Sequence, residues 1–112
     1  MSTPEGRVVK ACLEYLHVRK IFAWRNSTGA VHTRRANGSE GFLRFGCVGS
    51  ADIIGCLPDG RFLAVECKAE KGKLSEAQRY FLADITKLGG VAVVAKSIED
   101  IAAVLAADGY GK

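Results

Sequence analysis

The chain has 112 residues, an apolar fraction of 48%, a formal net charge of +4 and a pI near 9.0. This length suits one domain, residues 1–112, and the apolar fraction excludes an intrinsically disordered chain. No apolar run approaches the roughly 18 residues that a membrane-spanning helix requires, so we expect no membrane association, and the positive charge is compatible with an anionic partner.

The first half of the chain predicts a helix, a short strand and a long loop. Thr3-Pro4-Glu5 combines a capping hydroxyl, a proline suited to the first helical position and an acid in the first turn. Apolar residues at helical spacing carry this helix to about Lys20, and residues 21–25 then predict a short strand. Residues 26–41 are rich in Asn, Ser, Thr and Gly and predict a long loop, followed by another short strand at 42–45.

A tight turn in the middle of the chain predicts a β-hairpin. In the segment Leu57-Pro58-Asp59-Gly60-Arg61, Pro58 suits the first central position of a type I turn. Gly60 suits the left-handed residue that closes a three-residue hairpin loop. The two strands should cover about 52–57 and 61–68.

The last third of the chain predicts a helix, a strand and a helix. Ser75 caps the first of these helices, and Gln78 three residues later completes a capping box. Gly89-Gly90 ends that helix, the apolar run 91–95 is typical of a buried strand, and Ser97 caps the last helix. The element order predicts an α/β fold in which a mixed β-sheet is flanked by helices.

The cysteines and the N-terminal segment indicate a reducing compartment. The four cysteines form no CxxC pair and stand in apolar surroundings, so we interpret them as reduced core residues rather than as disulfides or zinc ligands. They are Cys12, Cys47, Cys56 and Cys67. Charged residues interrupt the N-terminal segment, so no secretory signal is predicted and we expect a cytoplasmic protein.

The predicted hairpin brings two acids and a lysine to one face. If Leu57 pairs with Arg61, counting outward places Asp52 directly opposite Glu66. Opposed residues face the same side of a sheet, with Cβ atoms about 4.5–5.5 Å apart. Lys68 lies two residues beyond Glu66 and therefore shares its face. Two opposed acids repel each other unless a proton or a cation lies between them, so this arrangement predicts a divalent metal site.

The reaction class that we expect of such a site is metal-assisted phosphodiester hydrolysis. Mg²⁺ and Mn²⁺ prefer oxygen ligands, which Asp52 and Glu66 supply and to which Cys67 adds its backbone carbonyl. Lys68 would hold or deprotonate the attacking water. The alternative is that these charges line a solvated hairpin face. The apolar run 62–65 and the second acid on the opposite strand favour the metal site.

The motif and its surroundings resemble a known family. Asp52 followed by Glu66-x-Lys68 resembles the PD-(D/E)xK nuclease signature, which is frequent by chance. Its flanking segments are more specific, and together they resemble the VRR-NUC (virus-type replication-repair nuclease) family over nearly the whole chain. These segments are Glu5 in the first helix, Arg25-Asn26-x-x-Gly29-Ala30, Gly49-Ser50-Ala51-Asp52-Ile53-Ile54-Gly55, Asp59-Gly60-Arg61-Phe62, Glu66-Cys67-Lys68, Gly72-Lys73-Leu74-Ser75-x-x-Gln78 and Gly89-Gly90-Val91. The likeness is to stand-alone phage and prophage members, with Ala51 in place of the proline that names the motif.

The resemblance implies a restriction-endonuclease-like core in which Asp52 and Glu66 bind the metal and Lys68 is the catalytic lysine. It also implies that Glu5 lies beside the metal and that Gln78 belongs to the active site. From the residues alone, Glu5 is equally well explained as an acid favoured by the helix macrodipole. One amide cannot fill both the capping role and the active-site role of Gln78, and we favour the active-site role.

Basic residues on both sides of the motif predict a phosphate track for nucleic acid. A solvated basic surface is the alternative, and Asn26 is also interpretable as an ordinary turn residue. Aromatic and basic residues do not interleave as in a base-stacking platform, so we expect recognition of backbone and shape. The predicted track contains Arg25, Asn26, Arg34, Arg35, Arg44, Lys71, Lys73 and Arg79.

We therefore expect a Mg²⁺- or Mn²⁺-dependent DNA endonuclease that is selective for branched DNA. Stand-alone relatives resemble Holliday-junction resolvases, which act as dimers, so we expect a homodimer in which the 26–41 loop docks between subunits. Two alternatives are a non-catalytic nucleic-acid-binding module and a partner-dependent subunit of a replication or repair assembly. Retention of Asp52, Glu66 and Lys68 speaks against the non-catalytic module.

Overall fold

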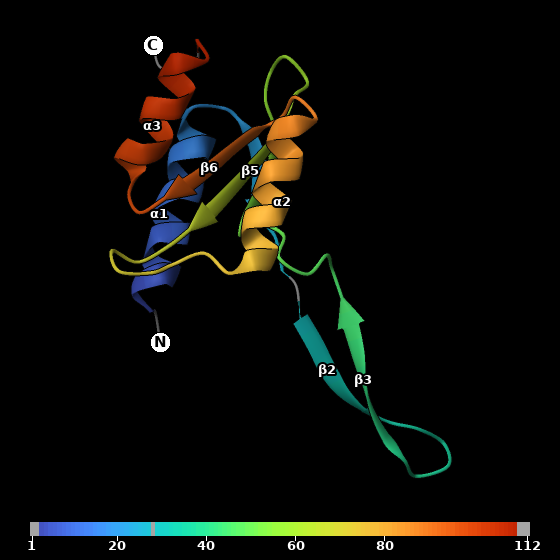
Figure 1. Cartoon of the computed structure of the whole chain (residues 1–112). Helices are drawn as coiled ribbons and strands as arrows, with labels where there is room; N and C mark the ends of the chain where they lie inside the picture. The colour runs from blue at the N-terminus through green and yellow to red at the C-terminus, as the bar shows by residue number, and fades with distance from the viewer. Residues whose placement is uncertain (1–2, 28, 110–112) are drawn as a thin grey trace.

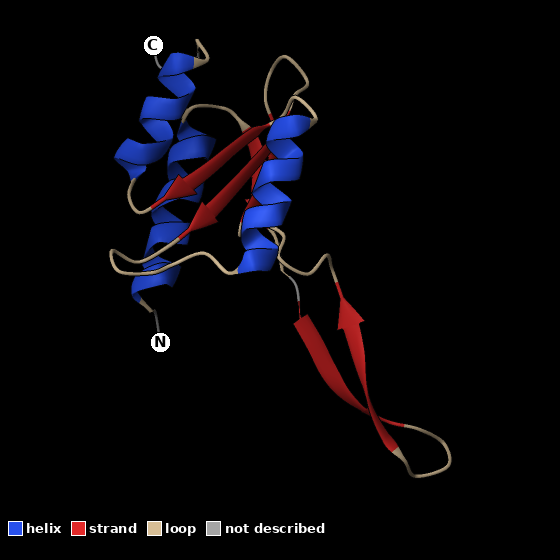
Figure 2. Cartoon of the chain, viewed as in Figure 1, coloured by secondary structure: helices blue, strands red, loops and turns tan. Residues whose placement is uncertain are grey.

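The computed structural model describes residues 3–27 and 29–109, with backbone alone for 29–32 and 42–45. The predicted mixed sheet flanked by helices is confirmed: α1 and α3 cover one face of the sheet and α2 covers the other (Figure 2). No helix in the described part of the chain is long and apolar enough to cross a membrane. The elements in chain order are α1 (Pro4–Val18), β1 (Phe22–Arg25), β2 (Gly29–Arg34), β3 (Glu40–Phe45), β4 (Ile53–Cys56), β5 (Phe62–Cys67), α2 (Glu76–Lys87), β6 (Val91–Ala95) and α3 (Ile98–Ala107).

The main sheet has the strand order β1-β4-β5-β6. Strands β1, β4 and β5 are antiparallel neighbours, whereas β6 returns through α2 and lies parallel to β5. The predicted hairpin register is confirmed, because Ile53 pairs with Val65 and the Leu57 N–H donates to the Arg61 carbonyl at 2.9 Å. Gly60 closes the turn at φ +93°, a conformation that favours glycine.

Two apolar layers hold the sheet between the helices. The larger core fills the space between the sheet and the α1–α3 pair, and the smaller one lies under α2. Leu63, Val65 and Cys67 of β5 point into the larger core, whereas Ala64 points into the smaller one. Alternate residues of β5 therefore pack into opposite apolar layers, as expected for a strand buried on both faces.

The helix termini follow the sequence signals with one exception. The Thr3 hydroxyl accepts the Gly6 N–H at 2.9 Å and begins α1, as predicted. Ser97 is the N-terminal cap of α3, but its side chain makes no capping hydrogen bond. The Asp100 carboxylate instead accepts the Lys96 N–H at 2.8 Å, which secures this helix start from within the first turn.

The predicted 26–41 loop is wrong, because most of this segment belongs to a second β-hairpin. Strands β2 and β3 pair antiparallel, with Arg34 opposite Glu40, and form a separate two-stranded sheet. Its turn contains Asn37-Gly38, with Gly38 at φ +87° and the Asn37 side chain accepting the Ser39 N–H at 2.9 Å. Asn-Gly is a strong hairpin signal, but the polar composition of the segment masked it. The hairpin projects from the body (Figure 1), and the chain measures 58 Å along its longest axis.

The prediction that all four cysteines lie in the core is only half right. All four are free thiols. Cys12 and Cys67 are buried between α1 and the sheet, whereas Cys47 and Cys56 are exposed. Cys56 is the last residue of β4, on the strand position that alternates with buried Gly55 and Leu57, so its side chain falls outside the apolar layers.

Candidate active site

Three carboxylates from separate parts of the fold meet at one end of the main sheet. Glu5 comes from the first turn of α1, Asp52 immediately precedes β4, and Glu66 lies near the end of β5. One ligand oxygen from each lies within 4.8 Å of the others. The structure thus brings Asp52 and Glu66 together as the hairpin register predicts, and it adds Glu5 to the same cluster.

Backbone contacts fix the position of Asp52. Its Oδ2 atom accepts the Cys67 N–H at 2.8 Å, which ties the acid to the strand that carries Glu66. On the other side, the Asp52 carbonyl accepts the Asn26 N–H at 2.7 Å. The Asn26 side-chain amide donates to the Ser50 hydroxyl at 2.7 Å and to the Ala51 carbonyl at 3.0 Å. Asn26 therefore orients the segment that leads into Asp52, a structural role that its sequence context did not reveal.

Glu66 is the most perturbed acid of the cluster. It is 1% exposed, and its Oε2 atom has no hydrogen-bond partner among the described residues. Burial is the main cause that raises its pKa to about 9, followed by the hydrogen bond with Asp52 and the charges of Asp52 and Glu5, while Lys68 opposes the increase. Burying a carboxylate without a partner costs free energy, so a proton or a bound cation would stabilise this oxygen.

Lys68 lies close enough to this cluster for its charge to lower the pKa of Glu66. The residue is 8% exposed, which is rare for a lysine, and its N–H donates to the Ala95 carbonyl at 3.0 Å. Gly72 lies over the lysine stem: a Cβ there would be 3.3 Å from the Cβ and Cδ atoms of Lys68. The turn at 69–72 thus encloses Lys68 and limits the positions that its ammonium group can adopt.

The thiol of Cys67 belongs to the core rather than to the cluster. A hydrogen bond with Cys12 is the main cause, ahead of burial, that raises the pKa of the Cys67 thiol, so this group stays protonated. The same hydrogen bond lowers the pKa of Cys12. A neutral thiol is a poor metal ligand, and the role of the Cys67 backbone carbonyl as a ligand stays a prediction.

Gln78 fills the capping role that we disfavoured. Its Oε1 atom accepts the Ser75 N–H at 2.8 Å, and the Ser75 hydroxyl accepts the Gln78 N–H at 3.1 Å. The side-chain oxygen is therefore engaged at the start of α2, where it satisfies a helix N-terminal donor. A direct role of Gln78 in the active site stays a prediction.

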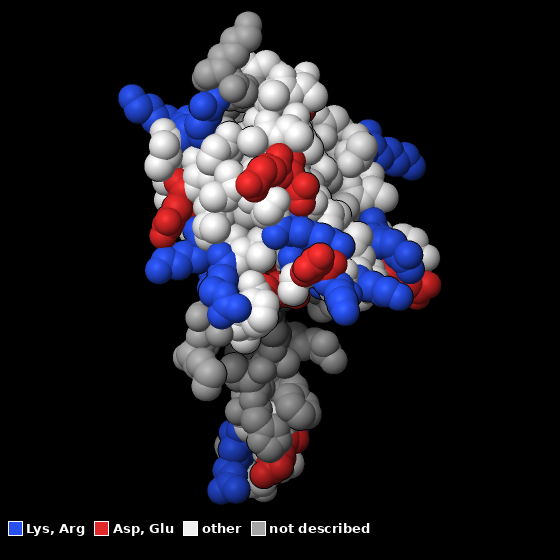
Figure 3. Space-filling view, turned by 90° about the vertical axis from the view of Figure 1, so that its left-hand side faces the viewer, with Lys and Arg blue, Asp and Glu red and all other residues white. Residues whose placement is uncertain are grey.

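The basic residues of the predicted track differ in their surroundings. The Arg35 guanidinium donates to the Glu40 carbonyl at 2.7 Å and so helps to hold the hairpin tip. The side chain of Arg44 lies outside the described residues. In the side view, Lys and Arg side chains gather around the lower half of the body, with acidic side chains among them (Figure 3). The remaining basic residues of the track are exposed: Arg25, Arg34, Lys71, Lys73 and Arg79.

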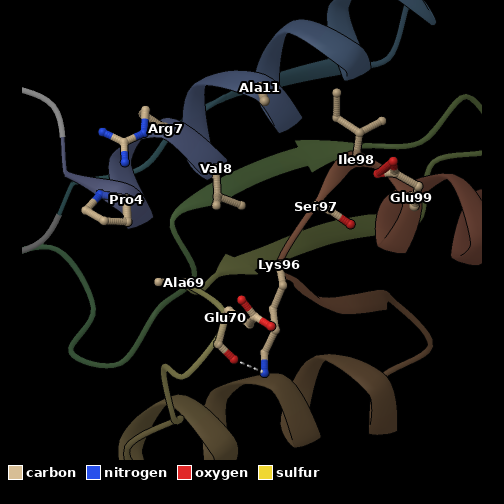
Figure 4. Close-up of a pocket in the computed structure, with 10 residues that line it drawn as sticks. All are labelled: Pro4, Arg7, Val8, Ala11, Ala69, Glu70, Lys96, Ser97, Ile98 and Glu99. Carbon is tan, nitrogen blue, oxygen red and sulfur yellow. Dashed lines mark hydrogen bonds between the residues drawn. The ribbon is translucent and has the colours of Figure 1, made fainter.

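A pocket of about 370 Å³ lies between the start of α1, the segment after β5 and the start of α3 (Figure 4). Its floor is aliphatic, with Val8 and Ala11 among the lining residues, and its rim carries both signs of charge. On that rim, the Lys96 ammonium donates to the Glu70 carbonyl at 2.7 Å. The mixed charge gives this pocket no preference for an anionic ligand.

Comparison with protein families gives one match. The model of the VRR-NUC domain matches residues 3–99, which include all three carboxylates and Lys68. No curated protein and no solved structure matches the chain. The matched family is the one whose motifs the sequence resembles.

Proposed function

We propose that this protein is a DNA endonuclease that requires Mg²⁺ or Mn²⁺ and selects branched DNA. The chain belongs to the VRR-NUC domain family and is therefore of nuclease type. One observation carries this proposal. The buried Oε2 atom of Glu66 has no described hydrogen-bond partner, and Glu66 clusters with the carboxylates of Asp52 and Glu5. A divalent cation bound among these three carboxylates would offset two of their negative charges and reduce their mutual repulsion.

The donor set fits a hard cation. Glu5, Asp52 and Glu66 would hold the ion, with the Cys67 carbonyl as a further oxygen ligand. Because Asp52 Oδ2 accepts the Cys67 N–H, its orientation is fixed before any ion binds, which limits the reorganisation on binding. A bound Mg²⁺ or Mn²⁺ supplies positive charge that polarises the phosphodiester and favours attack by water.

Lys68 acts on the water and the phosphate. The residue is nearly buried and its charge acts on Glu66, so its ammonium group is placed to orient the attacking water or to offset the negative charge that develops on the phosphate. Glu5 adds negative charge from α1 and helps to retain the ion at the edge of the sheet. Low exposure around Glu66 and Lys68 strengthens each of these interactions relative to water.

A homodimer is the assembly that the hairpin favours. Among the described strands, β2 and β3 pair only with one another, and they extend away from the main sheet (Figure 1). An isolated two-stranded hairpin is marginally stable in water. We propose that a second copy covers this hairpin, which would place two active sites on one branched substrate. Light scattering tests this assembly, and a strictly monomeric active enzyme would contradict it.

A cleavage panel tests the proposed activity. A four-way junction, a flap, a single strand and a linear duplex are incubated with Mg²⁺, Mn²⁺ or EDTA. We expect metal-dependent cleavage of the branched substrates, loss of cleavage in Asp52→Asn and Lys68→Met, and normal cleavage in Lys87→Met, whose lysine is exposed at the end of α2. Cleavage that persists in EDTA and in both site variants would refute the metal mechanism. Binding without cleavage under every metal would favour the non-catalytic or partner-dependent alternatives.

A further inference from the structure

Two aromatic side chains lie exposed on β1. Phe22 is 70% exposed and Trp24 is 46% exposed, and their ring centroids are 5.3 Å apart with an interplanar angle of 52°. Large aromatic side chains normally contribute to a core, where each buries about 150–250 Å². Between them, Ala23 points into the core beneath α1, so the two rings occupy the opposite face of the sheet.

The sheet register places these rings on the same face as the acidic cluster. Trp24 pairs with Ile54, which belongs to the apolar layer under α2. Asp52 lies two residues before Ile54 and therefore shares its face, one step of about 7 Å along the strand. The spacing between neighbouring strands, about 5 Å, is perpendicular to that step, so the diagonal distance from the Trp24 backbone to the Asp52 backbone is roughly 8 Å. This equals two or three base steps of a stacked DNA strand, at about 3.4 Å each.

The charge around the rings favours nucleic acid as the occupant. Exposed Lys20 precedes β1 and exposed Arg25 ends it, and the sequence contains no acid between Glu14 and Glu40, so the segment that carries the rings is positively charged. Exposed aromatic rings combined with positive charge are the components with which proteins bind single-stranded nucleic acid, because every base offers a π-face. The rings were missed in the sequence because they do not interleave with basic residues. The sheet, rather than the local pattern, displays them together.

A second copy of the chain fits this surface less well. The exposed area of the two rings is on the order of 250 Å², whereas a stable protein interface buries about 800 Å² on each partner. Pairing along the outer edge of β1 is also obstructed, because the His17 ring contacts the Ala23 carbonyl at 2.9 Å. That contact occupies a backbone group which an added strand would need.

We propose that Phe22 and Trp24 form a stacking platform for an unpaired base of the DNA substrate, next to the carboxylate cluster. This inference rests on the proposed function for the nature of the substrate. In a continuous duplex each base is covered by its neighbours, whereas a branch or a single-stranded end offers a free face. Stacking on this platform would therefore give the enzyme a preference for branched or single-stranded DNA over linear duplex, with phosphate contacts common to all substrates.

The only tryptophan of the chain is Trp24, so its fluorescence reports directly on this platform. Fluorescein-labelled oligothymidylate of 12 nucleotides and a blunt duplex are titrated in EDTA, where no metal-dependent cleavage interferes. Anisotropy of the label measures binding, and tryptophan emission of unlabelled complexes measures stacking. We expect the single strand to quench Trp24 emission at saturation and the duplex to leave it nearly unchanged.

Variants separate stacking from general binding. Trp24→Ala and Phe22→Ser should each weaken binding of the single strand about 5- to 100-fold and binding of the duplex less than 2-fold. Trp24→Phe should restore most of the affinity, because it keeps an aromatic face. Leu88→Ala is the matched control: this residue is 84% exposed at the end of α2, and its loss should leave both affinities unchanged. Melting curves by circular dichroism confirm that each variant is folded.

Any of four results would overturn the proposal. Two concern bound DNA: unchanged Trp24 emission when the single strand is bound, and equal weakening of both DNAs in Trp24→Ala. The third is Trp24 emission that changes with protein concentration in the absence of DNA, which would assign the surface to a second copy, and the fourth is the absence of any oligonucleotide binding. Because the assay contains no metal, its outcome is independent of cleavage. A protein that cuts DNA without involving Trp24 retains the proposed nuclease function and loses only the platform.

Discussion

The raised pKa of Glu66 makes a quantitative prediction for the metal-free protein. Burial and the neighbouring acids raise this pKa from 4.5 to about 9, so between these values the folded state carries a proton on Glu66 that the unfolded state has released. Stability present at pH 5 should therefore decline as the pH rises, by about 1.36 kcal/mol per pH unit for one such group. From pH 5 to pH 8 the free energy of unfolding should fall by about 4 kcal/mol at most, or about 15 °C in Tm.

Mg²⁺ should reverse this decline. The ion takes the place of the proton, and an ion that binds only the folded state adds about 2.7 kcal/mol at a concentration 100-fold above its Kd. Thermal melts at pH 5, 6, 7 and 8, with EDTA or Mg²⁺, measure both effects. Metal stabilisation should grow with pH, since the ion competes with fewer protons.

Glu66→Gln isolates the group responsible. The amide is neutral at every pH and can still donate a hydrogen bond to Asp52, so the variant should melt at a nearly constant temperature and respond weakly to Mg²⁺. Glu14→Gln, an exposed acid in the middle of α1, should behave like the unmodified protein. A flat pH profile in the unmodified protein, or an equal slope in Glu66→Gln, would refute the assignment of the buried charge to Glu66.

Three further substitutions test other parts of the site. Lys68→Met keeps the buried aliphatic stem and removes the charge. The single-turnover cleavage rate should therefore fall about 10²- to 10⁴-fold, while junction affinity changes by less than 3-fold. An unchanged cleavage rate would exclude Lys68 from the mechanism. Ser75→Ala removes half of the capping box with Gln78 and should cost about 1 kcal/mol in urea unfolding, with no loss of cleavage in the folded protein; a cleavage defect at full stability would instead give this cap a catalytic role. Gly49→Ala should lower the free energy of unfolding by about 2 kcal/mol or more, because Gly49 has φ +82° and an added Cβ would lie 2.6 Å from the Ala77 carbonyl oxygen. An unchanged free energy of unfolding would show that the segment before Asp52 can shift to accommodate the Cβ.

The fold was predictable where local signals agree with burial. The turn at 57–61 fixes the strand register by its own geometry, and the register alone places Asp52 opposite Glu66. The caps at Thr3 and Ser75 and the apolar spacing behind them define α1 and α2 in the same way. In each case neighbours in the sequence determine the structure, so no knowledge of distant contacts is needed.

Of the remaining features, one depends on distant contacts and two depend on local signals that allow more than one interpretation. The role of Asn26 comes from its contacts with Ser50 and Ala51, some 25 residues later. Gln78 carries one amide that suits two roles, and only the position of Ser75 decides which role its oxygen takes. The polar composition of residues 26–41 is typical of a loop, whereas the Asn37-Gly38 turn within it is typical of the paired strands β2 and β3.

The proposed roles in chemistry and in substrate selection fall on different elements of this fold, so variants can test them separately. The β4–β5 hairpin and the first turn of α1 hold the carboxylates, whereas β1 displays the aromatic pair at a distance of two or three base steps. A substitution in Trp24 should therefore change which DNA is cut and leave the metal-dependent stabilisation intact. A substitution in Glu66 should greatly weaken that stabilisation and leave the quenching of Trp24 by single-stranded DNA unchanged. Mg²⁺-dependent stabilisation and Trp24 quenching should both be measured in both variants. If each substitution changes both quantities, the DNA-binding and metal-binding residues are energetically coupled rather than independent.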